Sequence, residues 1–473
     1  MLSVAAALSL AACGEQRSGP VLVSAIGARP ELINPNLRPL DPPAAFLLGS
    51  VAQGLVRFDA AGEIEPALAQ SWIASDDGLR YTFRIRRTNW SSGGPVNAHE
   101  VAARLRAAAS RASRNALKPV LGGIENIVAM TDQVLEISLR GPRPNLLQLL
   151  AQPEMAIVLN GAGTGPYGII GVSGGAPLLS PLRSEEGERG PGPDVILQGE
   201  RAAAAVARFA AGEADLALGG TIGDLALARA ADQPNARLVF DPVQGLFGIA
   251  FANREGALGD PAVRRAMSMA IDREAIVTAL AVRGLEPRVT ILPGGLGELP
   301  RPASPSWAAI SLGARRQEAA AVVAGLGGPR VRVRVAMPDG AGYRIVFAYL
   351  RRDWAAIGVD AVRVRPQDTA DLRLIDAIAP ALLATWYLRF FTCDAALICD
   401  SAADEALAAA RAARTIAERR TQLAKADELL TSLTTYIPLA GPVRWSLAAQ
   451  RLNGFRPNPF ARHFAGELIA EER

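Results

Sequence analysis

The sequence GLVRFDAAGEIEPALAQSWIASDDGLRYTFRIRRTNWSSGGPVNAHEV, residues 54–101, carries the strongest structural signals in the chain. Within it, Tyr81, Phe83 and Ile85 alternate with polar residues. Such alternation turns one set of side chains to each face of a strand, so this segment predicts a half-buried β-strand. The glycines and the proline of SSGGP, residues 91–95, then predict a turn.

A helix is expected directly after this turn. Asn97 can cap its first turn, and the side chain of Glu100 can reach back to the amide of Asn97, as in a capping box. A second alternating stretch, QVLEISLR at residues 133–140, predicts another strand. Asp260, which is followed by a proline, and Asp272 are expected to cap two further helices.

The second half of the chain predicts a parallel βαβ unit. VRVRVAM at 331–337 and VDAVRVR at 359–365 have strand patterns, and residues 343–358 between them have helical spacing. Two strands joined in this way by a helix lie parallel, with a right-handed crossover. Residues 401–435 are rich in alanine and predict one or two long helices. The predicted fold class is therefore α/β.

The composition argues against several classes of function. The chain has 473 residues, half of them apolar, and a formal net charge of +4. Basic residues are spread along the chain without interleaved aromatics, which argues against nucleic-acid binding. His99 and His463 are the only histidines, and both are expected at the solvated surface, so zinc-type ligand clusters and general-base chemistry lack their usual residues. We expect no metal site, no cofactor and no catalytic residue.

The first residues resemble a secretory signal with a lipid-attachment site. Residues 2–12 carry no charge, and the run is shorter than the roughly 20 apolar residues of a membrane-spanning helix. LAAC at residues 10–13 is similar to a bacterial lipobox, in which Cys13 receives the lipid after cleavage. We therefore expect residues 1–12 to be a signal peptide and residues 13–20 a tether. An ordinary cleaved signal with an incidental cysteine is the alternative.

Two further cysteines lie in FFTCDAALICDS. Disulfides persist in proteins that are exported to oxidising compartments, so Cys393 and Cys399 are expected to form a local disulfide. Two buried free thiols are the alternative reading.

Residues 54–101 resemble the signature region of the extracellular solute-binding proteins of peptide ABC importers, the dipeptide- and oligopeptide-binding family. The family core Gly-x-Ile-x-Pro-x-Leu-Ala-x-Ser-Trp here runs from Gly62 to Trp72. GTGPY at residues 163–167 and the segment 248–277 are similar to later family motifs and follow in the same order. Several motifs in one order make chance similarity a poor explanation.

The resemblance implies a two-lobe clamshell of the type II-like periplasmic-binding-protein kind. The first lobe is expected at residues 21–249, with an extra subdomain at about 46–165. The second lobe is expected at residues 250–438, and residues 439–473 return to the first lobe. Two crossing strands would join the lobes, and ligand would bind between them.

The resemblance also implies a receptor without enzymatic activity. It would capture a peptide-like small solute and deliver it to an ABC permease with its ATPase. Such a receptor is expected to be a monomer in the periplasmic or extracytoplasmic cell envelope, held to a membrane by a lipid anchor. The alternatives are a degenerate family member with a structural or chaperone-like role and an envelope hydrolase, against which the scarcity of histidines argues.

Two stretches are expected to supply the ligand contacts. They are Glu31, Leu32 and Ile33 from the first lobe, and Asp376, Ala377, Ile378, Ala379 and Trp386 from the second. In peptide-binding members an aspartate in the second stretch pairs with the α-ammonium of the peptide, and no acid stands at that position here. We expect Asp376 or Glu31 to neutralise a cationic ligand, and Arg29, Arg373 or Arg389 to neutralise an anionic one.

Overall fold

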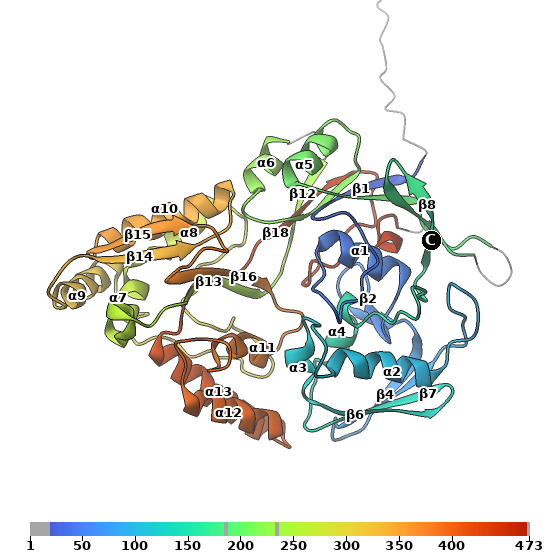
Figure 1. The fold of residues 1–473 in the computed structure, drawn as a ribbon, viewed down its shortest axis with the longest axis horizontal. Coiled ribbons are helices and arrows are strands. Elements are labelled where there is room, and N and C mark those ends of the chain that lie inside the picture. The colour runs from blue at the N-terminus through green and yellow to red at the C-terminus, as the bar shows by residue number, and fades with distance from the viewer. Residues whose placement is uncertain (1–18, 184–187, 232–235, 471–473) are drawn as a thin grey trace, which may run out of the picture.

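The structure, a computed structural model, describes residues 19–183, 188–231 and 236–470. Two lobes lie side by side, and an extra subdomain extends the first lobe next to helices of the second (Figure 1). Within these described residues, no helix combines the length and apolar character needed to cross a bilayer. The mixed α/β class and the two-lobe arrangement expected from the sequence are both confirmed.

The first lobe is built on a seven-stranded sheet with the order β12-β18-β11-β1-β10-β9-β8. Its strands are β1 (Val21–Ile26), β8 (Tyr167–Ser173), β9 (Ala176–Pro181), β10 (Val195–Glu200), β11 (Leu216–Gly220), β12 (Ala236–Asp241) and β18 (Arg444–Ala449). Strand β1 lies at the centre and runs parallel to β10 and β11. Its successive side chains pack into two different cores, against α1 (Pro42–Val51) on one face and α5 (Ala202–Ala210) on the other, with α6 (Leu225–Ala230) beside α5.

The extra subdomain is a four-stranded antiparallel sheet with the order β4-β5-β7-β6. Its elements are β4 (Ala69–Ala74), β5 (Arg80–Ile85), β6 (Ile124–Thr131), β7 (Val134–Leu139), α2 (Ala98–Ala109), α3 (Lys118–Leu121) and α4 (Leu146–Leu150), with β2 (Val56–Phe58) and β3 (Ile64–Pro66) forming a small hairpin. The predicted alternation of β5 is confirmed, because Tyr81, Phe83 and Ile85 are buried.

The cap of α2 is only partly as predicted. Asn97 accepts a hydrogen bond from the amide of Glu100, which confirms the cap. The carboxylate of Glu100 instead accepts a hydrogen bond from the indole of Trp90, at 3.2 Å. The prediction that it bonds back to Asn97 is therefore wrong, because the nearby indole N–H offers a partner from outside the helix.

The second lobe is built on a five-stranded sheet with the order β15-β14-β16-β13-β17. Its strands are β13 (Gly245–Phe251), β14 (Val331–Ala336), β15 (Val359–Val364), β16 (Leu372–Ile378) and β17 (Tyr436–Ala440). Its helices are α7 (Pro261–Ala270), α8 (Arg273–Leu280), α9 (Leu312–Ala324), α10 (Ala341–Ala355), α11 (Ala384–Leu388), α12 (Ser401–Ala412) and α13 (Ile416–Leu433). Strands β14 and β15 are parallel and joined through α10, which confirms the predicted βαβ unit.

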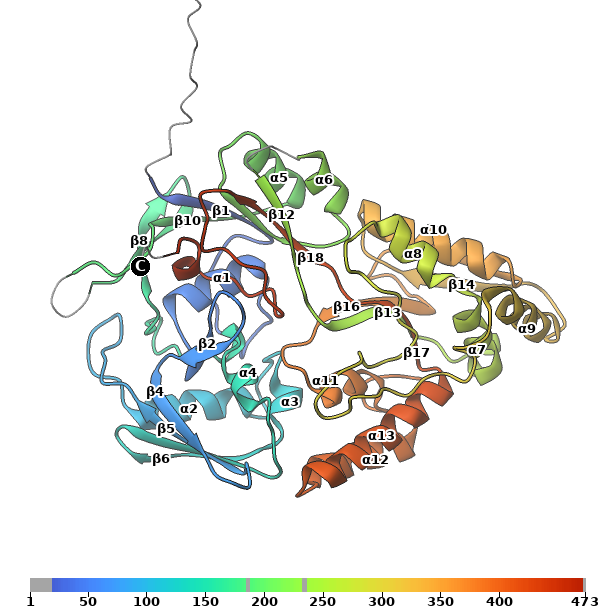
Figure 2. The ribbon, with the colours of Figure 1, turned by 180° about the vertical axis from the view of Figure 1, so that it is seen from behind.

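Two connections pass between the lobes, one from β12 to β13 and the other from β17 to β18 (Figure 2). The chain leaves one sheet and enters the other at residues 242–244 and 441–443. The boundaries expected at 249/250 and 438/439 therefore fall inside β13 and β17. Both strands belong wholly to the sheet of the second lobe.

A buried carboxylate in the second lobe leads to a prediction about pH. Asp427 of α13 has no exposed surface and accepts a hydrogen bond from the amide of Ala303 at 2.6 Å. Burial raises the pKa of Asp427 to about 7, compared with about 4 in an unfolded chain. The folded protein therefore disfavours the ionised form, so stability is greatest below about pH 4 and falls as the pH rises from about 4 to about 7.

We expect Asp427→Asn to raise the free energy of unfolding by up to about 4 kcal/mol at pH 8, and to change it little at pH 4. Urea unfolding at both pH values measures this difference. Asp394→Asn, at an exposed position in the same lobe, is the matched control. A gain that is equal at the two pH values would contradict the assignment.

Candidate ligand-binding site

A cavity lies where the two lobes meet beside the crossing connections, and we call it the inter-lobe cavity. It comprises about 830 Å³ of unfilled space, part of it open to solvent. The first lobe contributes the start of α1, β18 and residues 460–464, and the second lobe contributes Ile378, Ala379 and Pro380 at the end of β16. The cavity is therefore bounded by both lobes, as a ligand site in a clamshell must be.

The first-lobe wall is held rigidly by the entry to α1. Asp41 caps this helix by accepting a hydrogen bond from Ala44, and its other oxygen accepts from the amide of Ala28. Pro42 then stands close to Gly219 at the end of β11, where a Cβ atom would lie only 2.9 Å from that of Pro42. Gly219 also has a φ of +88°, so a glycine is required there on both counts.

The second-lobe wall is formed by a strand with one open edge. Strand β16 pairs with β13 along its whole length, but it pairs with β14 only at Leu372 and Arg373. Among the described residues, positions 374–378 therefore have no strand neighbour on that side, and all five are half-buried. Backbone groups on such an edge need partners, and a strand-like ligand can supply them.

Asp376 on this strand is already paired inside the protein. Its carboxylate accepts a hydrogen bond from the Tyr343 hydroxyl at 2.7 Å and one from Nη1 of Arg444 at 2.8 Å. The side chains of Asp376 and Arg444 are 9% and 15% exposed. Burial, followed by the charge of Asp376, raises the pKa of Tyr343, which keeps its hydroxyl protonated as a donor. A ligand cation at Asp376 would have to compete with Arg444.

The other predicted residues of the second lobe divide into two groups. Ile378 and Ala379 line the inter-lobe cavity. Trp386 on α11 is 4% exposed and packs edge-on against Tyr387 and Phe390. Ala377 packs partly against the same large apolar core. The structure therefore places Trp386 in the core of the protein and away from the inter-lobe cavity.

The structure does not bring the first predicted stretch to the same cavity. Glu31 is exposed and pairs with Arg38 at 2.7 Å. Leu32 and Ile33 line a separate cavity against α2. The loop is held there because Asn36 accepts hydrogen bonds from the amide of Arg114 and from the side chain of Asn115. These contacts between distant parts of the chain direct the loop toward the subdomain.

Sequence reasoning missed a polar network across the cavity. Arg462 donates to Gln152 at 3.0 Å and to Glu154 at 2.6 Å, and Gln152 donates to the carbonyl of Pro380 at 2.7 Å. The last of these bonds joins the two lobes. The C-terminal position of Arg462 gave no local signal, since its partners lie about 310 residues earlier.

His463 was expected at the surface, and this expectation is wrong. Its side chain is 6% exposed, and its Nε2 lies 3.3 Å from a carboxylate oxygen of Asp241. His99 is exposed, as expected. The arginines of the inter-lobe cavity are paired within the protein, Arg444 with Asp376 and Arg462 with Glu154.

Cys393 and Cys399, the two residues expected to form a disulfide, are joined by one in the structure, with Cα atoms 5.0 Å apart. We expect Cys393→Ser/Cys399→Ser to lower the free energy of unfolding by roughly 2–3 kcal/mol, because a short loop is no longer closed in the unfolded chain. Urea unfolding of the oxidised protein and the double variant measures this cost. Two alkylatable thiols in the denatured, oxidised wild type would contradict the pairing.

Two other expectations concern regions or groups outside this site. Cys13, with the expected signal peptide and most of the expected tether, lies outside the described residues. Within the described part of the chain, no group of three or more histidine, cysteine or carboxylate side chains is placed to hold a metal ion.

Residues 63–397 match the family model described as "Bacterial extracellular solute-binding proteins, family 5 Middle". The chain is 32% identical over 123 residues to the nickel-binding periplasmic protein of Escherichia coli (strain K12), covering 26% of this chain and 23% of that one. It is 30% identical over 135 residues to the dipeptide-binding protein DppE of Bacillus subtilis (strain 168), covering 24% and 25%. These alignments span about a quarter of each relative.

Solved structures resemble nearly all of this chain. The fold is similar to that of Haemophilus influenzae OppA in complex with RPPGFSPFR, with a TM-score of 0.79, 18% identity and coverage of 95% of this chain and 99% of that one. It is equally similar to the Escherichia coli murein tripeptide binding protein MppA, with a TM-score of 0.79, 20% identity and coverage of 96% and 99%. At these identities the similarity establishes the fold.

Proposed function

Because the chain belongs to the family 5 bacterial extracellular solute-binding proteins, we propose that it is the substrate-binding receptor of an ABC import system. It captures a peptide-like small solute between its lobes and delivers it to a permease that works with an ATPase. The observation that carries this proposal is the open edge of β16, residues 374–378, which ends at the inter-lobe cavity.

The open edge gives the receptor a way to hold a peptide-like main chain. An extended ligand that adds to β16 receives backbone hydrogen bonds along one side, while its alternate side chains face the cavity walls. Those walls include the aromatic rings of Phe46, Phe460 and Phe464. Backbone bonding with apolar pockets suits a receptor that accepts several related ligands.

The charge pairing around the cavity suggests which part of the ligand is recognised. Asp376 has a charged partner within the protein, namely Arg444. Displacing such a partner would leave a buried charge unpaired, which costs several kcal/mol, on the order of 3–5. We infer that the receptor holds the ligand mainly through the ligand's main chain and apolar groups. A free α-ammonium group is not the main group that it recognises.

Binding is expected to act together with closure of the lobes. The bond from Gln152 to the carbonyl of Pro380 and the bond from the amide of Leu382 to Gln148 both cross between the lobes. A ligand that fills the cavity between these contacts favours the closed arrangement over an open one. The permease could then distinguish loaded receptor from empty receptor by shape.

Native mass spectrometry of gently purified protein tests the proposal. We expect a co-purified solute, and we expect it to bind again when it is titrated into protein from which it has been removed. Ala379→Trp should abolish this binding by filling the cavity, whereas Val362→Trp, on the exposed side of β15, should not. Equal affinity in both variants, with unchanged melting temperatures, would exclude the inter-lobe cavity as the site.

We also infer that the receptor is a monomer held to a membrane through a lipid on Cys13. Two or more acyl chains at one residue give stable membrane attachment, which a single chain does not. Cys13→Ser is therefore expected to move the protein from the membrane fraction to the soluble fraction, or to block its processing. Membrane attachment and mature mass that are the same in variant and wild type would contradict the anchor.

A further inference from the structure

The hairpin of β8 and β9 carries an exposed apolar surface, which we call the hairpin patch. It consists of Ile169, Ile170 and Val172 on β8 and of Leu182 just after β9, with exposed fractions from 39% to 68%. Leu182 belongs to the same surface because it lies over Gly168, where an added Cβ atom would be 2.8 Å from Cδ2 of Leu182. Neighbouring apolar side chains in solvent are typical of a surface that contacts a membrane or another protein.

The hairpin patch lies on an edge strand that is poorly suited to pairing with another strand. Strand β8 is the last in the order of the first-lobe sheet. A register shift between Ile169 and Gly171 leaves Ile170 without an opposite residue on β9 within the described chain, which is a β-bulge. Bulges twist an edge away from regular pairing, so a second copy of the chain is not the expected partner. Nη2 of Arg29 donates to the carbonyl of Gly175 at 3.0 Å and so holds the turn of the hairpin in place.

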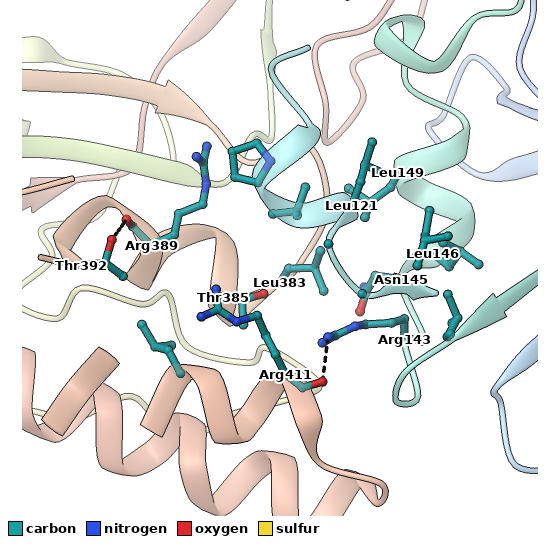
Figure 3. A pocket seen from close by; sticks show the side chains of 17 residues that line it. Leu121, Arg143, Asn145, Leu146, Leu149, Leu383, Thr385, Arg389, Thr392 and Arg411 are labelled. Carbon is teal, nitrogen blue, oxygen red and sulfur yellow. Dashed lines mark hydrogen bonds between the residues drawn. The ribbon is translucent and has the colours of Figure 1, made fainter. Parts of the chain in front are cut away.

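Two other apolar surfaces of the first lobe differ from the hairpin patch. At the seam with the second lobe, Leu121 and Leu149 are buried in one core with Leu383 (Figure 3). On the subdomain sheet, Ile73 of β4 and Val128 of β6 are exposed, but polar residues of β5 and β7 lie between them in the same row. The first surface is therefore covered and the second is interrupted, whereas the hairpin patch is exposed and continuous.

The hairpin patch lies close to the point where the expected tether joins the first lobe. The strand register places Val21, the first residue of β1, in one row with Ile169 through β10 and β9. Neighbouring strands are about 4.8 Å apart, so Ile169 lies roughly 14 Å from Val21. Both ribbon views show the start of β1 beside β8 (Figures 1 and 2).

The length of the expected tether limits how far this corner of the lobe can be from a membrane. Eight positions separate Cys13 from Val21, and an extended chain spans at most about 3.6 Å per residue, or about 29 Å in all. The distance from Val21 to the hairpin patch is shorter than this reach. A lipid on Cys13 can therefore stay inserted while the hairpin patch touches the bilayer surface.

We propose that the hairpin patch lies against the membrane to which the receptor is tethered. This inference rests on the proposed lipid anchor at Cys13 and adds a second contact to it. Ile169, Ile170 and Val172 enter the boundary between lipid headgroups and acyl chains, where burial of their side chains is favourable. A lipid and a hairpin together restrict rotation of the first lobe more than a lipid alone, so the cleft keeps a defined direction relative to the bilayer.

A fluorescent label at position 172 tests the proposal. Cys13 carries the lipid, and Cys393 and Cys399 are joined in a disulfide, so Val172→Cys adds the one free thiol of the chain for a nitrobenzoxadiazole label. The labelled, lipidated protein is added to preformed vesicles of phosphatidylethanolamine and phosphatidylglycerol. We expect blue-shifted emission and about threefold weaker quenching by iodide than for the same label at Ile73→Cys, because the hairpin leaves water on entering the bilayer interface. Ile73 is the matched control, since it is an exposed apolar residue on the subdomain sheet.

A charge in the hairpin patch provides a second test. Ile170→Asp in the protein labelled at position 172 should restore iodide quenching to the level of the Ile73→Cys control, because burying a carboxylate in lipid is costly. Equal quenching of the two labels on vesicle-bound protein without this change would overturn the proposal. Protection of the Val172→Cys label that depends on protein concentration and not on vesicles would assign the patch to a second copy and also overturn it. Failure of the protein to bind vesicles at all would contradict the lipid anchor and, with it, this inference.

Discussion

Arg444→Met is expected to lower the free energy of unfolding by about 3–5 kcal/mol. The reason is that Asp376, whose side chain is 9% exposed, loses the guanidinium that faces it at 2.8 Å. Methionine keeps most of the apolar volume of the arginine side chain. The loss of stability therefore measures mainly the unpaired charge of Asp376. Urea unfolding at pH 7 gives the difference.

The matched control for this variant is Arg363→Met. Arg363 also pairs with an aspartate, but that residue, Asp339, has a side chain that is 78% exposed. An exposed pair contributes about 0–1 kcal/mol, so this control should differ little from the wild type. If Arg444→Met were as stable as Arg363→Met, Asp376 would not depend on Arg444. The interpretation that Arg444 neutralises Asp376 within the protein would then be wrong.

Glu298→Ala is expected to lower the free energy of unfolding by a similar amount, about 3–5 kcal/mol. Glu298 and Arg419 are each 3% exposed at the side chain and form a pair at 2.7 Å. The other oxygen of Glu298 accepts a hydrogen bond from the amide of Ala384, the first residue of α11. Alanine leaves the arginine charge buried without its partner and also leaves the amide at the start of α11 without its acceptor.

Glu318→Ala is the control for the second variant. Glu318 pairs with Arg265 on the surface, where the two side chains are 46% and 42% exposed. We expect this change to cost less than about 1 kcal/mol in urea unfolding. A similar small cost for Glu298→Ala would show that the buried pair is not needed to hold α11 against α13.

Local patterns predicted much of the fold because they depend on neighbouring residues. The alternation at residues 80–85 and the caps at Asn97, Asp260 and Asp272 each involve contacts within a few positions, and the structure confirms them. The parallel unit of β14, α10 and β15 follows from the same kind of reasoning. These features need no information about the rest of the chain.

The positions of the site residues depend on contacts between distant parts of the chain, which local sequence patterns do not reveal. Asp376 is paired with Arg444, which lies 68 positions later on the other lobe. The loop that holds Leu32 and Ile33 is directed toward the subdomain by Asn36, through contacts with residues about 80 positions away. Of the residues predicted to bind ligand, Ile378 and Ala379 line the inter-lobe cavity. They lie at the end of β16, which the resemblance to the family had predicted to be at the cleft.

Trp386 is another predicted site residue whose position the local sequence does not determine. An aromatic residue close to a predicted cleft suits both ligand stacking and core packing. The structure places it in the core because α11 turns that face toward Tyr387 and Phe390. The direction of a short helix is set by contacts such as Glu298 with Ala384, which join segments 86 residues apart.

Hydrogen–deuterium exchange tests the central claim, that ligand is held between the lobes against the open edge of β16. The measurement compares protein carrying its co-purified solute with protein from which the solute has been removed. We expect the solute to slow amide exchange at residues 374–378, because the open edge gains hydrogen-bonded partners. Exchange in the β8–β9 hairpin, which lies at the far edge of the first-lobe sheet, should not change. Unchanged exchange at residues 374–378, with protection in another part of the chain, would contradict the account.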